Sequence, residues 1–320
     1  MLARVDPLVR LLLAAILLAT VLPVTGPARG VAQQVSNAAI FMLFFFNGLR
    51  LARREVLAGI GNHRLLVPLM VWVFAVMGLA GWATWQATTP LIAPTLALGF
   101  LYLGVLPSTV QSATAYSSLA GGNVASSVVA AALVNIAGVF ITAPLFSLIA
   151  GSKGAGFHAD SLIKVLTVLL LPFVLGQVAQ RFLRGWVSDH RTLVTWLDRL
   201  SIAIAVYVAF SGAVEQGLWR MVGPFAWVVV CGATAVLLAF AHGGAWALGA
   251  VLKLPRGDRI ALLFAAGQKS MALGAPLATV LFPPATAGLI LLPLLVYHLA
   301  QMVLAAPVAT RLRAGGEAAA

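Results

Sequence analysis

The sequence predicts an all-α integral membrane protein with ten transmembrane helices. Three observations lead to this class: 62% of the residues are hydrophobic, only 9% are charged, and the mean hydropathy is +1.03. A soluble domain carries about 25% charged residues, so this chain has too little polar surface to cover a globule in water. Residues 65–152 contain no Asp, Glu, Lys, Arg or His. Because a spanning helix needs about 20 apolar residues, this run holds three crossings.

We expect a single membrane domain over residues 1–320, since apolar segments follow one another along the whole chain. The ten expected crossings lie at about 8–25, 32–49, 65–85, 91–119, 123–149, 161–181, 199–216, 222–252, 258–281 and 285–310. They form one repeat at about 8–149 and a second at about 161–310, followed by a short cytoplasmic tail at 311–320. The single cysteine, Cys231, excludes a disulfide framework and a Cys-based zinc site, and we expect no metal or cofactor.

The positions of basic residues test this count, because cytoplasmic loops are enriched in Lys and Arg. Ten crossings place fifteen basic residues on one side of the membrane: Arg4, Arg10, Arg50, Arg53, Arg54, Arg64, Arg181, Arg184, Arg191, Arg199, Lys253, Arg256, Arg259, Arg311 and Arg313. The other side receives Arg29, Lys153, Lys164 and Arg220. This asymmetry supports ten crossings with both termini cytoplasmic. Many Arg, Ala and Gly residues suggest a GC-rich bacterial genome, and hence the inner membrane. The +12 net charge then reflects topology, so we expect the lipid bilayer as surroundings and no nucleic-acid partner.

Two of the expected crossings are interrupted by Gly or Pro beside polar residues, the fourth within residues 106–118 and the ninth within residues 266–276. Proline removes a helical hydrogen bond and glycine loosens the backbone. Freed peptide groups are tolerated at membrane depth only inside protein or beside a water-filled cavity. The two interruptions take the same place in two five-helix halves, and an odd number of helices inverts the second half. Paired interrupted helices in an inverted repeat predict the binding site of a transporter.

At these residues the chain resembles the bile acid/sodium symporter superfamily, in its SBF-like branch, from about residue 6 to 312. The most specific stretches are Phe44-Phe45-Phe46-Asn47-Gly48, Leu106-Pro107-Ser108-Thr109-Val110-Gln111-Ser112, Gly121-Gly122-Asn123 and Gln268-Lys269-Ser270. The resemblance implies ten helices in two inverted five-helix repeats, with a panel domain and a core domain. It also implies that the broken fourth and ninth helices cross near the middle of the membrane.

The resemblance carries over unevenly to the ion sites of sodium-coupled members. A serine and an asparagine after the fourth-helix break fall on Ser112 and Ala113, and a fifth-helix serine is kept as Ser127. The ninth-helix glutamate shared by both sodium sites falls on Phe264, whereas the neighbouring glutamine is kept as Gln268. The sequence therefore lacks the carboxylate of the family's ion sites, which argues against sodium coupling.

Lys269 is the most informative candidate, because an ionisable group at membrane depth marks a functional site by default. It could stand in for a bound cation, pair with an anionic substrate or exchange a proton; the alternative is that it snorkels to the interface. The other side chains expected to bind substrate or ion are Gln111, Ser112, Thr114, Ser127, Gln268 and Ser270. These could instead satisfy only the broken backbone or join neighbouring helices.

Other polar residues favour structural roles. Asn123 follows two glycines and suits the cap of the fifth helix. Glu215 lies five residues before Arg220, which favours an interfacial pair over a proton relay. His242 and His298 stand singly in apolar runs, without a second ligand at metal-binding spacing.

We expect a secondary active transporter that moves an organic, preferably anionic, solute by alternating access. The anion preference rests on Lys269 and on half-helix N-termini, whose dipoles favour negative groups. Proton coupling is left open and sodium is uncertain. One alternative is a non-transporting membrane regulator of ion handling. A membrane-embedded enzyme is the other, and the absence of a nucleophile–base pair, an HExxH motif or a carboxylate dyad argues against it.

Overall fold

The computed structural model describes residues 6–50, 62–151 and 166–317. In these ranges every regular element is a helix, and each of the ten expected apolar segments overlaps one. Arg4, Arg53, Arg54, Lys153 and Lys164, which entered the charge count, lie outside the described residues. So do the start of the sixth expected crossing and the last three residues of the expected tail.

Six described helices are long and apolar enough to cross a membrane, or seven spans if one bent pair counts as a single crossing. The six are His63–Thr88, Val124–Ala150, Arg191–Glu215, Pro224–Val251, Arg256–Leu281 and Pro284–Gly315, and the bent pair is Pro94–Val105 with Val110–Leu119. The chain is therefore an all-helical, multi-pass membrane protein with one clearly broken helix pair. The inverted repeat of ten crossings stays a prediction.

The chain forms two compact units, each assembled from separated stretches of sequence. Unit 1 comprises Met1–Ala52, Ala150–Pro224 and Ala272–Leu292. Unit 2 comprises Arg53–Ile149, Phe225–Met271 and Pro293–Ala320.

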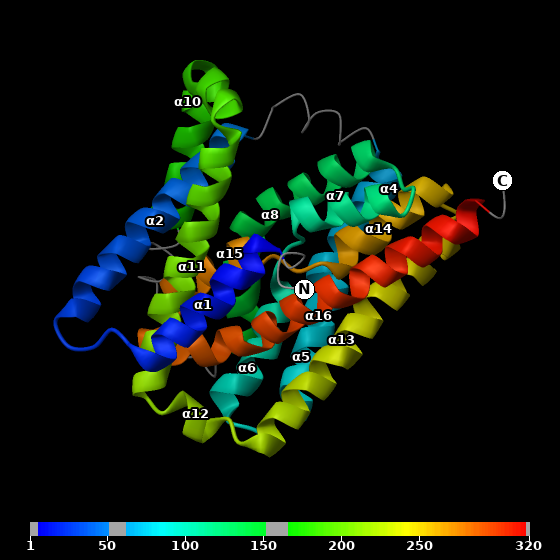
Figure 1. Ribbon diagram of the computed structural model, residues 1–320. Helices are drawn as coiled ribbons and strands as arrows, with labels where there is room; N and C mark the ends of the chain where they lie inside the picture. Colours follow the sequence, from blue (N-terminus) through cyan, green and yellow to red (C-terminus); the bar gives the residue numbers. More distant parts are fainter. Residues whose placement is uncertain (1–5, 51–61, 152–165, 318–320) are drawn as a thin grey trace. The chain divides into compact units, whose positions relative to one another are not determined.

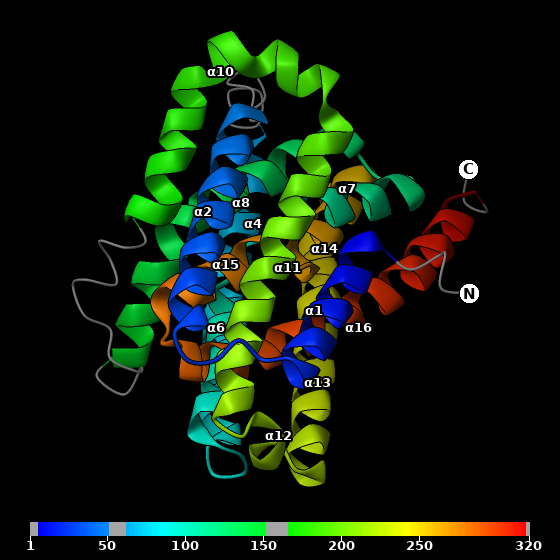
Figure 2. The same ribbon diagram turned by 60° about the vertical axis from the view of Figure 1, so that its left-hand side comes forward.

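Unit 1 is built around a packed group of long helices. They are α1 (Pro7–Val21), α2 (Ala28–Arg50), α10 (Leu171–Asp189, after a π-helical turn at Leu166–Leu170) and α11 (Arg191–Glu215), with the short α12 (Leu218–Met221) and most of α15 (Met271–Leu281). Helix α2 packs against α10 and α11, and α1 packs against α11 (Figure 1). Figure 2 shows α2, α10 and α11 side by side from a second direction.

Two glycines allow α2 and α10 to approach closely. A Cβ added at Gly48 would lie 2.2 Å from the carbonyl oxygen of Phe173, and one added at Gly176 would lie 2.2 Å from that of Phe45. Gln180 of α10 then donates from Nε2 to a carbonyl oxygen near the end of α2. Such reciprocal small residues are typical of close helix pairs in membranes.

Ion pairs join α2 to α11 near both ends. Arg29 pairs with Glu215, and Arg50 pairs with Asp198, so the two helices run antiparallel. The expected partner of Glu215 was Arg220, five residues away. In the described chain its partner is Arg29, because tertiary packing brings the start of α2 to the end of α11.

Unit 2 contains the first interrupted helix and the part of the second as far as Met271. Its elements are α4 (His63–Met70), a π-helical segment (Val71–Val76), α5 (Met77–Thr88), α6 (Pro94–Val105), α7 (Val110–Leu119), α8 (Val124–Ala150), α13 (Pro224–Val251), α14 (Arg256–Gly267) and the greater part of α16 (Pro284–Glu317). Gly81 of α5 and Gly104 of α6 pack so closely that a Cβ added at either would lie 2.8 Å from the Cα of the other, so neither has room for a side chain. Asn123 accepts the N–H of Ser126 at 3.1 Å, which confirms its expected role as a cap of α8.

Candidate functional site

The first interruption separates α6 from α7, whose axes differ by 61°. Leu106 and Thr109 have extended backbones, with ψ angles of 147° and 122°. Leu106 precedes Pro107, and a proline ring disfavours the helical conformation for the residue before it. The ring packs against Gly138 of α8, where an added Cβ would lie 2.4 Å from Pro107 Cγ. The local sequence thus ends α6, and a glycine on α8 makes room for the break.

The second interruption follows α14. This helix ends at Gly267, the backbone of Gln268 is extended with ψ 138°, and α15 begins at Met271. Gly267 lies against the ring of His242 on α13, because a Cβ at Gly267 would be 2.5 Å from His242 Nε2. Tyr297 of α16 donates its hydroxyl to the carbonyl oxygen of Gly267 at 2.7 Å. Neighbouring helices therefore hold the end of α14 from two sides.

The two interruptions are joined by one bond between backbones and one from a side chain to a backbone. The N–H of Ser270 donates to the carbonyl oxygen of Pro107 at 2.9 Å. Thr109 Oγ1 donates to the carbonyl oxygen of Lys269, also at 2.9 Å. These bonds give peptide groups freed by the two breaks a partner in each other, as the interior of a membrane requires.

Lys269 is fully buried, and its ammonium group meets backbone carbonyl oxygens. Lys269 Nζ donates to Leu106 O at 2.7 Å, to Gly104 O at 2.8 Å and to Val73 O at 3.4 Å. The Gly104 oxygen belongs to the last turn of α6 and the Leu106 oxygen to its C-cap, and carbonyl groups at a helix end have no partner within the helix. The third lies in the π-helical segment. Lys269 does not snorkel; it caps the end of a broken helix.

Gln301 of α16 holds the peptide groups of Lys269, although it is not among the site residues predicted from the sequence. Its Oε1 accepts the Lys269 N–H at 2.8 Å, and its Nε2 donates to the Lys269 carbonyl oxygen at 3.1 Å. Gln301 lies one helical turn after Tyr297, which binds Gly267. A pair of polar residues four apart in an apolar span is the signal that would have identified this face of α16.

The remaining candidate residues divide between the crossover and its surroundings. Ser112 Oγ donates to Gln268 Oε1 at 3.0 Å, so this pair joins α7 to the second break. Ser127 donates to Ser117 Oγ at 3.0 Å and thereby joins α8 to α7. Gln111 is exposed. The structure therefore groups Ser112, Gln268, Lys269 and Ser270, while Ser127 and Gln111 lie outside this group of contacts.

An aromatic contact joins α14 to α7 at Phe264, the position where the resemblance implies a glutamate in sodium-coupled members. Phe264 is fully buried on α14, and its ring lies 5.8 Å from the ring of Tyr116 on α7, centroid to centroid, at an angle of 33°. Tyr116 also donates its hydroxyl to the carbonyl oxygen of Met302 on α16. At Phe264, α14 therefore meets α7 through aromatic packing and carries no carboxylate.

Several polar atoms at the breaks are buried and have no hydrogen-bond partner in the described chain. They are Gln268 Nε2, Ser108 Oγ and Thr114 Oγ1. Since Ser112 holds the oxygen of the Gln268 amide, its nitrogen is left as a donor. In addition, the N-terminus of α7 has no side-chain cap at Thr109. Buried polar groups are almost always satisfied, so these atoms indicate a place for an acceptor, either water or a bound solute.

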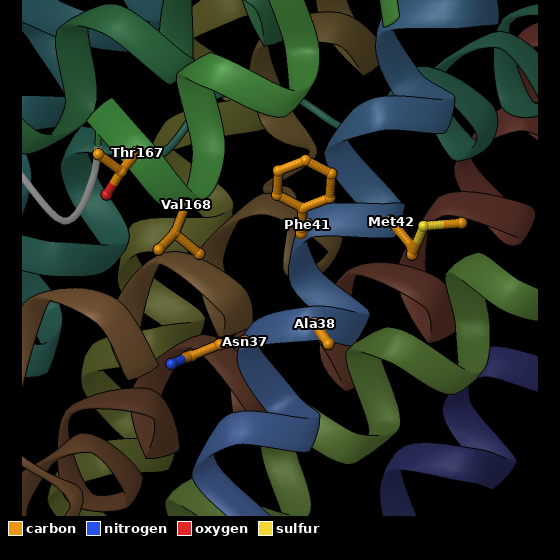
Figure 3. A pocket seen from close by; sticks show the side chains of 6 residues that line it. All are labelled: Asn37, Ala38, Phe41, Met42, Thr167 and Val168. Carbon is orange, nitrogen blue, oxygen red and sulfur yellow. The ribbon is translucent and has the colours of Figure 1, made fainter. Parts of the chain in front are cut away.

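A separate hollow of about 390 Å³ lies on unit 1 (Figure 3). Its lining comes from α2 and from the π-helical turn before α10: Asn37, Ala38, Phe41, Met42, Thr167 and Val168. None of these six side chains is charged. The lining is mostly apolar, which suits a surface in contact with lipid better than a site for a charged solute.

A family model fits the chain from residue 6 to 314 and describes the SBF-like CPA transporter family. The chain belongs to this family. That membership confirms the resemblance expected from the sequence motifs, and it favours a transporter over an enzyme.

Individual relatives extend this family relationship. The chain is 38% identical to an uncharacterized protein of Pseudomonas aeruginosa over 94% of its own length and 90% of the relative's. It is 35% identical to "Putative symporter YfeH" of Escherichia coli, over 96% and 92% of the two lengths. Mouse sodium/bile acid cotransporter 7 is 23% identical over 84% and 80%. The chain is thus a multi-pass membrane protein of a symporter family with bacterial members.

Proposed function

We propose that this protein is a secondary active transporter that moves an organic anion by alternating access and does not require sodium. The observation that carries the proposal is the buried, unpartnered donor at Gln268 Nε2, beside two interrupted helices that bind each other. Sites of this kind in transporters lie where half-helices meet, and their N-terminal ends favour anionic groups. The uncapped N-terminus of α7 and the Gln268 amide together favour an acceptor such as a carboxylate or sulfonate oxygen.

The case against sodium rests on Phe264 and Lys269. The first removes the carboxylate that a cation would need, and the second places a unit positive charge at the end of α6. Two like charges about 4 Å apart repel by about 4 kcal/mol at an effective dielectric of 20. At about 1.4 kcal/mol for each factor of ten, this repulsion would weaken the affinity for a sodium ion at that distance about a thousandfold.

Ligand-induced stabilisation of the purified full chain tests the binding part of this proposal. Folded protein is screened for thermal shifts with organic anions that include bile acids, because a ligand of the native state raises its stability by mass action. Gln268→Leu should abolish the shift, whereas Gln86→Leu, at an exposed position on α5, should preserve it. Equal shifts in both variants would place the solute elsewhere.

Uptake into proteoliposomes separates transport from regulation. Transport predicts accumulation or exchange of any anion that stabilises the protein. If such an anion binds without flux, the protein is a regulator that keeps the transporter fold.

We further propose that both termini are cytoplasmic, on the basis of the asymmetry of basic residues, and that the membrane is a bacterial inner membrane, on the basis of the many Arg, Ala and Gly residues. Reporter fusions after Arg64 and after Arg259 should both read as cytoplasmic. A periplasmic signal after Arg259 would show that the second half has been miscounted.

A further inference from the structure

Three carbonyl oxygens of unit 2 converge on one point inside the protein. They belong to Val73, Gly104 and Leu106, and they lie 3.4, 2.8 and 2.7 Å from Lys269 Nζ. The last carbonyl groups of a helix have no partner within the helix, and they carry the negative end of its dipole. We call this group of oxygens the carbonyl cage.

The Lys269 ammonium fills the carbonyl cage and matches it in number, since it has three donors and meets three acceptors. The side chain is 0% exposed, and in the described part of unit 2 no carboxylate forms an ion pair with it. Its positive charge is therefore balanced by backbone dipoles. A neutral amine has only two N–H groups, so proton release would leave one carbonyl oxygen unpaired. The geometry favours a fixed cation over a proton carrier.

The cage is held by contacts that do not involve Lys269. Gly104 packs against Gly81 of α5, where a Cβ added at either residue would lie 2.8 Å from the Cα of the other, and this close packing holds the end of α6. Thr142 Oγ1 of α8 donates to the carbonyl oxygen of Val105 at 3.1 Å. Val105 lies between Gly104 and Leu106, whose carbonyl oxygens belong to the cage. These contacts predict that the oxygens stay in place when the lysine side chain is shortened.

We propose that the carbonyl cage is a binding site for a monovalent cation and that Lys269 occupies it as a tethered cation. Rings of backbone carbonyl oxygens replace the hydration shell of a monovalent ion in channel filters. In transporters, the C-terminal ends of half-helices coordinate the coupling cation. Here that cation is bonded to the chain, so it cannot be exchanged with the solution. This inference concerns the folded state and does not depend on the proposed transport activity.

Chemical rescue tests the proposal. Lys269→Ala removes three carbons and the ammonium, which are the atoms that n-propylammonium supplies. Melting of this variant is followed in propylammonium, sodium, potassium or choline chloride at equal ionic strength. Choline has more heavy atoms than the substitution removes, so it serves as the salt control.

Lys269→Met is the matched control, because its side chain fills much of the same space without a charge. We expect propylammonium or a small metal cation to raise the melting temperature of Lys269→Ala by about 5 °C at about 100 times its dissociation constant. The methionine variant should not respond. No response from Lys269→Ala, or an equal response from both variants, would overturn the proposal.

If Lys269→Ala cannot be purified, amine labelling of the wild-type protein tests the proposal instead. A fixed ammonium enclosed by carbonyl oxygens should resist acylation in the folded protein, while Lys253, which is exposed, should react. Mass spectrometry should then find label at Lys269 only after unfolding. Labelling of both lysines at similar rates would contradict a tethered cation.

Discussion

The two units compensate their charged side chains in different ways. In unit 1, charge meets opposite charge: Arg29 pairs with Glu215 and Arg50 with Asp198, and these side chains keep 12–36% of their exposure. In unit 2, the fully buried Lys269 meets the dipoles of backbone carbonyl groups instead.

The difference follows from where the helices end. Helix α2 is continuous over Ala28–Arg50, and its two arginines are about 32 Å apart along the axis, close to the thickness of about 30 Å of a bilayer core. Its terminal groups can therefore reach the interfaces. Helix α6 ends at Val105 among fully buried residues, so its last carbonyl groups need a donor from the protein. An interrupted helix thus creates a local need for positive charge that a continuous helix does not have.

The largest expected effect is the loss of the charge in unit 2. Lys269→Met should destabilise the protein by about 3–5 kcal/mol, the range seen when one partner of a buried charged contact is removed. Lys253→Met, at an exposed turn, should change stability by less than about 0.5 kcal/mol. Equilibrium unfolding in mixed micelles measures both. Equal effects would show that the carbonyl groups of α6 do not need the ammonium.

A smaller effect is expected from the close approach of α2 and α10 in unit 1. Gly176→Ala places a Cβ 2.2 Å from the carbonyl oxygen of Phe45, and overpacking of this kind costs about 1–3 kcal/mol. Gly185 lies on the same helix with no atom within 4 Å of an added Cβ, so Gly185→Ala should be neutral or slightly stabilising. If the two variants have the same free energy of unfolding, the close packing of these helices does not contribute to stability.

The ion pairs of unit 1 should matter least. Arg29→Gln breaks a pair whose side chains are 28% and 36% exposed, and such pairs contribute about 0–1 kcal/mol. Arg50→Gln should cost more, because it leaves the Asp198 side chain, 12% exposed, without its partner. Double-mutant cycles with Glu215→Gln and Asp198→Asn give the two coupling energies. A larger coupling for the exposed pair would reverse the ranking.

The sequence allowed the helices and both interruptions to be predicted because their causes are local. Pro107 ends α6 through its own ring, and Gln268 and Lys269 stand in a polar cluster within an apolar span. The contacts of Lys269 were not predictable in this way. Its acceptors are 163–196 residues away along the chain, and one of them belongs to the π-helical segment Val71–Val76. The roles of Gln301 and the exposure of Gln111 likewise depend on tertiary packing.

The ion dependence of the wild-type protein is the most direct test of a fixed cation at the interrupted helices. Melting of the full chain is compared in sodium, potassium and choline chloride at equal ionic strength, with and without an anion that stabilises it. Because Lys269 already occupies the carbonyl cage, the melting temperature and the anion-induced shift should be the same in all three salts. A rise specific to sodium, which neither potassium nor choline reproduces, would contradict the fixed cation and restore sodium as the coupling ion.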